Sequence, residues 1–266
     1  VKQFLNDVDQ STLCEIIIID QTKWEDIEQV FQKELEVFQN NPLIKYYNEP
    51  TPSLPLARNK IISRSKGDII VWIDDDVIVN RNFIIDYLNV FQNNDCVACA
   101  GQIFQRNDSA DENLINKHNY TNYCHTAYQG VDLKPFDSPL IGCNHATLKS
   151  SLLQVSGVDE NYRGSGYYSD ADLGDRLRLK FGKDSILLSE KASLIHLKAK
   201  VGGCKINNIK RSEKDSLYPF VFYFFRYRLN KFDFLKGMYE ILRVGPLRKQ
   251  NVIKLKSFYS FFILVS

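Results

Sequence analysis

An uninterrupted apolar run that ends in three acids constrains this chain more than any other feature. Ile69–Ile73 are all apolar, and Asp74, Asp75 and Asp76 follow directly. A short apolar run bounded by polar residues is typical of a buried strand, so the acids are predicted at the edge of a sheet. The alternative is that they only end the strand, with Asp76 capping a helix that begins near Asn80. Adjacent carboxylates repel one another, and three of them favour a divalent cation that takes part in phosphate chemistry.

The composition indicates a globular protein and gives no support for nucleic-acid binding. The chain has 266 residues and a formal net charge of +2, which is too small to indicate a nucleic-acid partner. Its 6 cysteines are scattered, and Cys96 and Cys99 lie in an apolar segment typical of a buried strand. We therefore expect reduced structural thiols and a cytoplasmic protein.

Helices and strands alternate along the first part of the sequence. The hydrophobic pattern predicts a helix over Phe4–Leu13, a strand over Glu15–Ile19, and helices over Trp24–Phe38 and Ala57–Ser65. This alternation predicts an α/β fold with a mostly parallel sheet, whose ligands bind beyond the carboxyl ends of the strands. Asp20 and the acids at 74–76 both follow predicted strands. We therefore expect them on the same rim of the sheet.

The later part of the sequence completes this domain and adds a C-terminal extension. Helices are predicted over Lys149–Ser156 and Ala171–Phe181, and short strands over Ile186–Leu188 and Ser193–Leu197. The segment 104–139 is polar and aromatic with weak periodicity, and we interpret it as rich in loops. The interpretation gives a main domain at 1–210 and a helical, aromatic-rich extension at 211–266.

A second group of acids follows a loop that contains glycines. Gly164 and Gly166 precede Asp170 and Asp172, which lie at the start of a predicted helix. Acids are favoured in the first turn because the helix dipole is positive there, so helix capping is the simple alternative. The presence of a second acidic cluster at 74–76 favours a catalytic interpretation.

At this point motifs along most of the chain resemble those of the family 2 glycosyltransferases, which have the nucleotide-sugar-binding GT-A fold. The matching segments are Glu15–Asp20, Leu54–Asn59, Gly67–Asp76, Gly142–Asn144, Gly157–Glu160, Asp170–Leu177 and Ile195–Leu197. Within them, 74–76 is similar to the family's metal-binding Asp-x-Asp. The segment 170–174 is similar to its Glu-Asp-x-Asp-Leu-Gly helix start.

The resemblance implies a role for individual residues. It implies that the nucleotide sugar is bound by Asp20, Arg58, Asn59, Asp74 and Asp75. It implies that Mn²⁺ or Mg²⁺ is held by Asp74, Asp76 and His196, a mixed oxygen and nitrogen set unlike a closed structural zinc site. It implies that substrate is bound by Asn144 and Asp172, and that Asp170 is the catalytic base. For His196, which alternates with apolar neighbours, the alternative is a buried structural histidine.

The implied activity is that of a metal-dependent inverting hexosyltransferase. Such an enzyme moves a sugar from a nucleoside-diphosphate sugar, of the UDP or dTDP type, to a hydroxyl of a glycan or lipid-linked acceptor. The expected setting is synthesis of cell-envelope polysaccharide, in the cytoplasm or at the inner face of the cell membrane.

The sequence departs from the family pattern in two places. Ser169 stands where members usually have Glu, so Asp170 is the acid that matches the usual base. The family's first strand should precede the helix at 4–13, and the sequence is therefore expected to be a fragment without that strand. Both departures suggest a catalytically inactive sugar-binding or membrane-attached module as an alternative.

Two further alternatives concern the acids and the C-terminal part. An Asp-x-Asp after an apolar strand is also similar to the nucleophile motif of haloacid dehalogenase-type phosphatases, although Ile78 stands where those enzymes have Thr or Val. The aromatic run 218–225 lies beside Arg226 and Arg228. It is too short to span a bilayer, and we expect it either to lie at a membrane surface or to pack on the main domain.

Overall fold

The computed structural model describes most of the main domain and part of the C-terminal extension at 211–266 (the C-terminal segment). The described residues are 2–23, 33, 36, 40–106, 120–122, 133–136, 140–162, 166–197, 219, 222, 223, 226 and 227. The predicted helix 24–38 lies largely outside these residues.

The first half of the described chain contains both helices and strands. In order they are α1 (Lys2–Asp7), a 3-10 helix (Gln10–Thr12), β1 (Ile16–Asp20), β2 (Ile44–Asn48), α3 (Leu54–Arg64), β3 (Ile69–Ile73), β4 (Val77–Val79), α4 (Phe83–Asn93) and β5 (Ala98–Arg106). The second half contains β6 (Tyr120–Asn122), β7 (Lys134–Pro135), β8 (Asn144–Leu148), α5 (Lys149–Gln154), α6 (Ser169–Phe181) and β9 (Ile186–His196).

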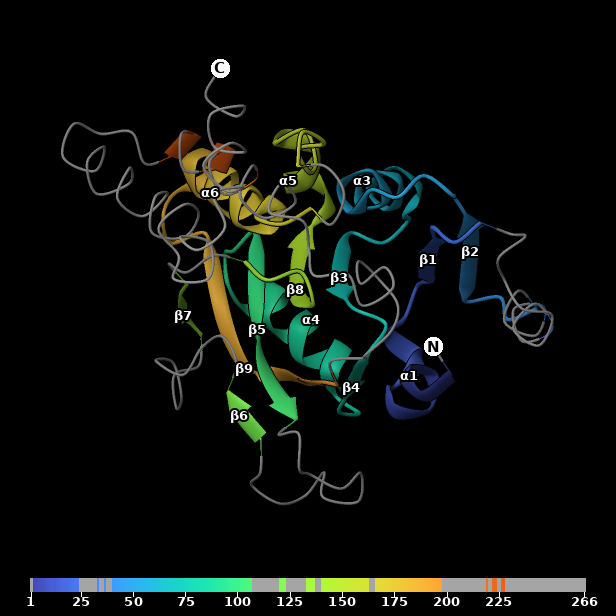
Figure 1. Cartoon of the computed structure of the whole chain (residues 1–266). Coiled ribbons are helices and arrows are strands. Elements are labelled where there is room, and N and C mark those ends of the chain that lie inside the picture. Colours follow the sequence, from blue (N-terminus) through green and yellow to red (C-terminus); the bar gives the residue numbers. More distant parts are fainter. Residues whose placement is uncertain are drawn as a thin grey trace, which may run out of the picture.

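The strands form two sheets among the described residues (Figure 1). The parallel strands β1 and β2 form a two-stranded sheet. A seven-stranded sheet has the order β3-β8-β5-β9-β4, with β6 paired to β5 and β7 paired to β9. Its longest pairing, β5 with β9, is parallel, and its other pairs are antiparallel. The rim predicted to join Asp20 with the acids at 74–76 is therefore not formed within a single sheet.

Helices cover both faces of the larger sheet. Along β3, Ile70 and Trp72 pack in a cluster with residues of α3, α5 and α6, whereas Ile69 and Val71 pack against a cluster built on α4. Successive side chains of a strand point to opposite faces, so both faces of β3 are apolar. This explains the uninterrupted apolar run in the sequence.

Several predicted elements are found with changed bounds, and others were missed. The predicted helix at 4–13 is split into α1 and the 3-10 helix, and the two short strands predicted within 186–197 are one strand, β9. The segment interpreted as rich in loops contains the end of β5 and the short strands β6 and β7. The sequence interpretation did not include β2, β4 or β8, and it included a helix near α4 only in the alternative in which Asp76 caps a helix.

The start of α6 depends on backbone with positive φ angles. Gly166 has φ +64° and Tyr168 has φ +67°, and helical geometry begins at the next residue, Ser169. A Cβ on Gly166 would lie 2.9 Å from Pro55 Cδ, so only glycine fits against α3 at this turn. The turn therefore fixes where the first turn of α6, which carries Asp170, lies against α3.

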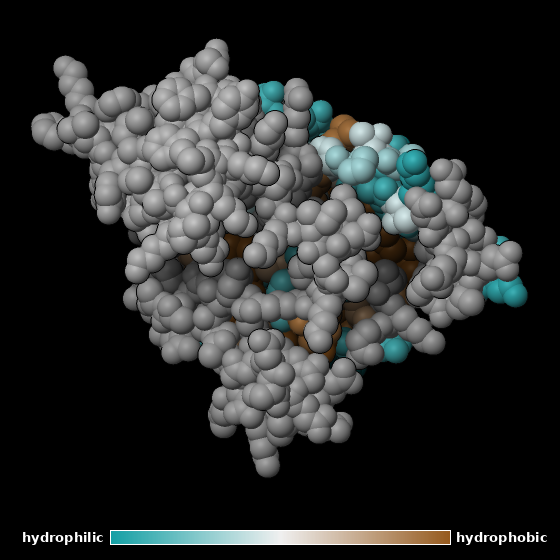
Figure 2. Space-filling view, in the orientation of Figure 1, coloured by the Kyte–Doolittle hydropathy of each residue, from teal (hydrophilic) through white to brown (hydrophobic). Residues whose placement is uncertain are grey.

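The surface in the orientation of Figure 1 is hydrophilic over α3, whereas hydrophobic residues lie deeper toward the middle of the face (Figure 2). Within the part of the chain that the structure describes, no helix combines the length and apolar character needed to cross a bilayer.

Candidate functional site

Two aspartates and a histidine meet beyond the end of β3. His196 Nε2 lies 3.1 Å from Asp76 Oδ1 and 3.6 Å from Asp74 Oδ2. One ligand atom from each of the three residues lies within 4.8 Å of the others. The three residues predicted as metal ligands therefore lie close together, although 120 positions separate Asp76 from His196 in the sequence.

Pairing between β4 and β9 produces this convergence. The antiparallel register places Val77 opposite His196, and Leu197 N donates a hydrogen bond to the carbonyl oxygen of Asp76 at 2.8 Å. Because Asp76 immediately precedes β4, it lies beside the last residue of β9. The turn between β3 and β4 then brings Asp74 to the same place.

The three side chains suit a divalent cation. They supply two carboxylate oxygens and one imidazole nitrogen, a set that accepts Mn²⁺ or Mg²⁺ and leaves positions for water and phosphate oxygens. The side chains of Asp76 and His196 are 17% and 20% exposed, whereas that of Asp74 is 47% exposed. The cluster is thus held by the sheet on one side and open to solvent on the other. Asp75 is also exposed.

A buried arginine forms an ion pair with the predicted catalytic base. Arg58 Nη1 bonds Asp170 Oδ1, and the side chains of these residues are 6% and 18% exposed. The Arg58 guanidinium also lies over the Trp72 ring, 5.6 Å from its centroid. The ion pair joins α3 to the first turn of α6 and fixes one oxygen of the carboxylate.

Gly142 and His145 complete the surroundings of this ion pair. A Cβ on Gly142 would overlap Arg58 Nη2 and lie 2.7 Å from Asp170 Oδ2, so only a residue without a side chain fits there. The buried His145 ring stacks on Trp72 with centroids 6.2 Å apart. Burial lowers the pKa of His145 to about 4, so the ring is neutral at physiological pH. The sequence carries no local signal for these contacts.

The acid predicted to contact the nucleotide, Asp20, ends β1. Its Oδ2 accepts a hydrogen bond from the Tyr46 hydroxyl at 2.7 Å, and its Oδ1 accepts one from Thr22 N at 2.8 Å. Burial and this carboxylate raise the pKa of Tyr46 to about 12, so its hydroxyl stays a donor. Asp20 is thereby oriented at the carboxyl end of the two-stranded sheet.

Two predicted site residues, Asn59 and Asn144, have side chains that bond other groups of the protein. The Asn59 amide bonds both the N–H and the carbonyl of Val158, at 2.8 and 2.9 Å, and also Glu160 at 2.7 Å. Asn144 is 1% exposed; it donates to two carbonyls and accepts the Tyr87 hydroxyl at 2.7 Å. Their predicted contacts with donor and substrate stay predictions, and the structure gives both residues a role in holding strands and loops.

Asp172 is the most enclosed of the predicted site residues. Its side chain is 0% exposed, and its Oδ2 accepts a hydrogen bond from Arg176 Nε at 2.7 Å. Its Oδ1 accepts hydrogen bonds from the hydroxyls of Tyr162 and Tyr227, at 3.2 and 2.6 Å. A direct contact of Asp172 with substrate stays a prediction, because in this structure its carboxylate binds other side chains.

Comparison with known proteins places the chain in a family. The family model described as glycosyl transferase family 2 matches residues 1–155, which is more than half of the chain. The chain belongs to glycosyltransferase family 2. No curated protein matches it. Family membership removes the support for the phosphatase alternative, since the Asp-x-Asp motif falls within the matched region.

Solved structures of glycosyltransferases have the same fold. S. aureus TarS 1-349 in complex with UDP-GlcNAc is similar with a TM-score of 0.63 and 12% identity, over 93% of this chain and 70% of that one. GalNAc-T7 with UDP, GalNAc and Mn²⁺ gives a TM-score of 0.57 and 13% identity, over 82% of this chain and 43% of that one. The mannosyltransferase PcManGT from Pyrobaculum calidifontis, in complex with GDP-Man and Mn²⁺, gives a TM-score of 0.50 and 11% identity, over 71% of this chain and 49% of that one. The predicted α/β class and GT-A fold are confirmed. The larger sheet is mixed rather than mostly parallel, because among its described pairs β5 with β9 is parallel and the others are antiparallel.

Proposed function

We propose that this family 2 glycosyltransferase is a metal-dependent inverting enzyme that moves a sugar from a nucleoside-diphosphate sugar to a hydroxyl of a glycan or lipid-linked acceptor. The observation that carries the proposal is the cluster of Asp74, Asp76 and His196, together with Asp170 held at the start of α6. Structures of similar fold contain UDP-GlcNAc, or UDP or GDP-Man with Mn²⁺. A UDP or dTDP donor is our first expectation.

The donor side follows from charge. A sugar that leaves a nucleoside diphosphate builds negative charge on the departing phosphate, and Mn²⁺ or Mg²⁺ would neutralise it as a Lewis acid. Asp76 and His196 are the enclosed ligands, and the more exposed Asp74 would hold the cation from the solvent side. Asp20, at the end of β1, would contact the base or ribose of the nucleotide.

The acceptor side follows from the geometry of Asp170. Its Oδ1 is bound by Arg58, so Oδ2 is the oxygen that would take the proton of the acceptor hydroxyl. The acceptor oxygen forms a bond with the anomeric carbon as the bond from that carbon to the diphosphate oxygen breaks. Attack from the face opposite the leaving group inverts the configuration. The products are the glycosylated acceptor and the nucleoside diphosphate.

Calorimetric titration tests the donor site first. UDP, dTDP and GDP would be titrated into the folded chain with and without Mn²⁺, and into Asp76→Ala and Asp68→Ala. We expect one nucleotide to bind in a Mn²⁺-dependent manner, with binding lost in Asp76→Ala. Asp68→Ala is the matched control, because Asp68 is exposed, lies outside the cluster and precedes β3 at the end opposite to Asp74. Equal binding by all three proteins would refute the metal site.

Release of nucleoside diphosphate tests the reaction. The donors would be UDP-GlcNAc, UDP-GalNAc, dTDP-glucose and GDP-Man, with Mn²⁺. We expect Asp170→Asn to lower kcat by at least about a hundredfold, since a general base contributes about 10²–10⁴-fold. Nucleotide and metal binding should be unchanged. Near-normal turnover by the variant would remove Asp170 as the base.

The cellular setting is part of the same proposal. We propose a cytoplasmic enzyme, at the inner face of the cell membrane where a lipid-linked acceptor would be reached. Cys14 and Cys96 have free thiols, as a reducing compartment would favour. Fractionation of cells that express the chain, with detection in the soluble and membrane fractions, tests this location.

A further inference from the structure

The C-terminal segment places one helical face against α6. Its described residues are helical, and their spacing of three and four positions puts them on one side of a helix: Pro219, Phe222, Tyr223, Arg226 and Tyr227. Figure 1 shows these positions beside α6. The segment therefore contacts the helix whose first turn carries Asp170.

Aromatic packing forms the first part of this contact. The Tyr223 ring stacks on Tyr168, the residue before α6, with centroids 5.2 Å apart. The Phe222 ring meets Tyr162 edge-on, also at 5.2 Å, and Tyr223 and Tyr162 form a buried cluster with Ala171. The packed positions at 168 and 171 flank Asp170 in the sequence.

Hydrogen bonds to the buried carboxylate of Asp172 form the second part. The Tyr227 hydroxyl donates to Asp172 Oδ1 at 2.6 Å, and Arg226 Nη1 lies 3.1 Å from the same oxygen. On the other side Asp172 binds Arg176, whose Nη1 bonds the carbonyls of Val155 and Gly157 at 2.5 and 2.7 Å. Asp172 thus connects the C-terminal segment to the loop after α5.

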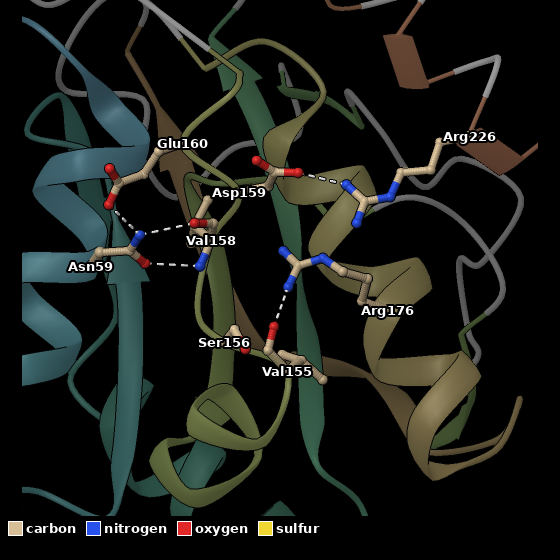
Figure 3. Close-up of a pocket in the computed structure, with 8 residues that line it drawn as sticks. All are labelled: Asn59, Val155, Ser156, Val158, Asp159, Glu160, Arg176 and Arg226. Carbon is tan, nitrogen blue, oxygen red and sulfur yellow. Dashed lines mark hydrogen bonds and ion pairs between the residues drawn. The ribbon is translucent and has the colours of Figure 1, made fainter.

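Arg226 also binds a second acid, Asp159 (Figure 3). Its Nη1 bonds Asp159 Oδ2 at 2.6 Å. Arg226 and Asp159 line a pocket of about 430 Å³, together with Asn59 and Arg176. Although burial acts to raise it, the pKa of Asp159 is lowered overall by hydrogen bonds from Asn161 and Arg226. Acids and bases alternate along this chain of contacts, so each charge has an opposite neighbour.

Among the described residues, no side chain caps the start of α6. The residue before it, Tyr168, makes no side-chain capping bond, and the Ser169 hydroxyl is buried without a hydrogen-bond partner. The first four N–H groups of a helix have no partner within the helix, and here Ser169 N donates to the Gly166 carbonyl at 2.8 Å. The contacts of Asp172, together with the ion pair between Arg58 and Asp170, are polar restraints on the turn that presents Asp170.

We propose that Arg226 and Tyr227 are positioning residues for the catalytic base: by binding Asp172 they hold the first turn of α6 so that Asp170 faces the acceptor. This proposal rests on the proposed function of Asp170. It assigns this face of the C-terminal segment to the transferase domain. The membrane contact predicted for this segment stays a prediction for the surfaces outside this face.

Two tyrosines one helical turn apart provide a matched test. Tyr227→Phe removes the hydroxyl that binds Asp172, and Tyr223→Phe removes the hydroxyl that binds Asp175, in the second turn of α6. Both changes remove one hydroxyl and keep the ring, so their effects on folding should be similar. Only the first changes the restraint on the turn that carries Asp170.

The experiment measures kcat, donor KM and thermal midpoint in the full chain, with the donor that the release assay identifies. We expect Tyr227→Phe to lower kcat at least about threefold, with donor KM and nucleotide binding within about twofold of the unaltered chain. The double variant that carries Arg226→Met and Tyr227→Phe should have a kcat about tenfold lower than that of the unaltered chain, which corresponds to about 1.4 kcal/mol. When Arg226→Lys replaces Arg226→Met in the double variant, most of that loss should be restored, because the charge is retained.

The outcomes separate this proposal from the proposed function. Equal losses of kcat in Tyr223→Phe and Tyr227→Phe, or losses that follow the thermal midpoint, would indicate a merely structural contact and overturn the positioning role. An unaltered kcat in the Arg226→Met and Tyr227→Phe double variant would also overturn it. If the unaltered chain releases no nucleoside diphosphate from any donor, the proposed function itself fails, and the positioning role fails with it.

Discussion

Substitution of Gly142 by alanine tests whether the ion pair between Arg58 and Asp170 sets the catalytic geometry. A methyl group at this position would overlap Arg58 Nη2 and lie 2.7 Å from Asp170 Oδ2. An ordinary contact between heavy atoms is about 3.5 Å, so Oδ2 would have to withdraw by about 0.8 Å, and Arg58 by more. Arg58 is 5% exposed and packs over Trp72, so it has little space to move.

The size of the effect follows from this displacement. Overpacking of a buried site costs about 1–3 kcal/mol, and separation of a largely buried ion pair costs more, so we expect a loss of about 2–4 kcal/mol in the free energy of unfolding. Misplacement of a catalytic group by about 1 Å lowers the rate about a hundredfold. We therefore expect the kcat of Gly142→Ala to fall by about one to two orders of magnitude, whereas nucleotide binding is retained.

Urea denaturation, nucleotide titration and nucleoside-diphosphate release would be measured on Gly142→Ala and on Gly67→Ala. The second variant is the control, because a Cβ on Gly67 would lie 3.5 Å from the Ile69 carbonyl oxygen, an ordinary contact. We expect the control to keep its stability and turnover. If Gly142→Ala keeps kcat within twofold and unfolds like the control, the reasoning about the ion pair is refuted.

Two further predictions concern buried polar groups in β8. Burial lowers the pKa of His145 to about 4, so the unfolded chain takes up a proton below about pH 6.5 before the folded one does. The stability that this group contributes is fully present above pH 6.5 and is lost as the pH falls toward 4. Urea denaturation should show that the free energy of unfolding falls by about 2 kcal/mol between pH 7.5 and pH 5 because of this group. His145→Gln should lack that part of the pH dependence. Identical pH dependence in both proteins would contradict it. Tyr87→Phe leaves the buried oxygen of Asn144 without its 2.7 Å donor, so we expect a loss of about 1–3 kcal/mol in the free energy of unfolding, and an unchanged denaturation midpoint would show that the bond contributes nothing.

The strands and helices that the sequence predicted well are those whose burial gives a simple pattern. β3 was placed at its observed bounds because both of its faces are apolar, and α6 was placed to within two residues of its start. β8 was missed because three of its five residues, Asn144, His145 and Thr147, are polar and yet buried. Nothing local in the sequence shows that distant groups surround these side chains.

β9 illustrates the same limit. It was interpreted as two short strands because Ser189, Glu190 and Lys191 interrupt the apolar pattern. In the structure the strand is continuous, and the pairing of β5 with β9 shifts register between Gly101 and Ile103 beside this polar segment. The irregularity belongs to the pairing of two strands, so a pattern within one strand does not reveal it.

Local sequence determined which residue types stand at strand and helix ends, because apolar runs and helix-favouring acids act over a few residues. It thereby selected the acids at 74–76 and Asp170. Only the tertiary structure decided their partners: the β4 and β9 register brings His196 to Asp76, and the packing of α3 on α6 pairs Arg58 with an acid 112 positions away. Such contacts depend on backbone register and side-chain shape across elements distant in the sequence, and no local spacing encodes either.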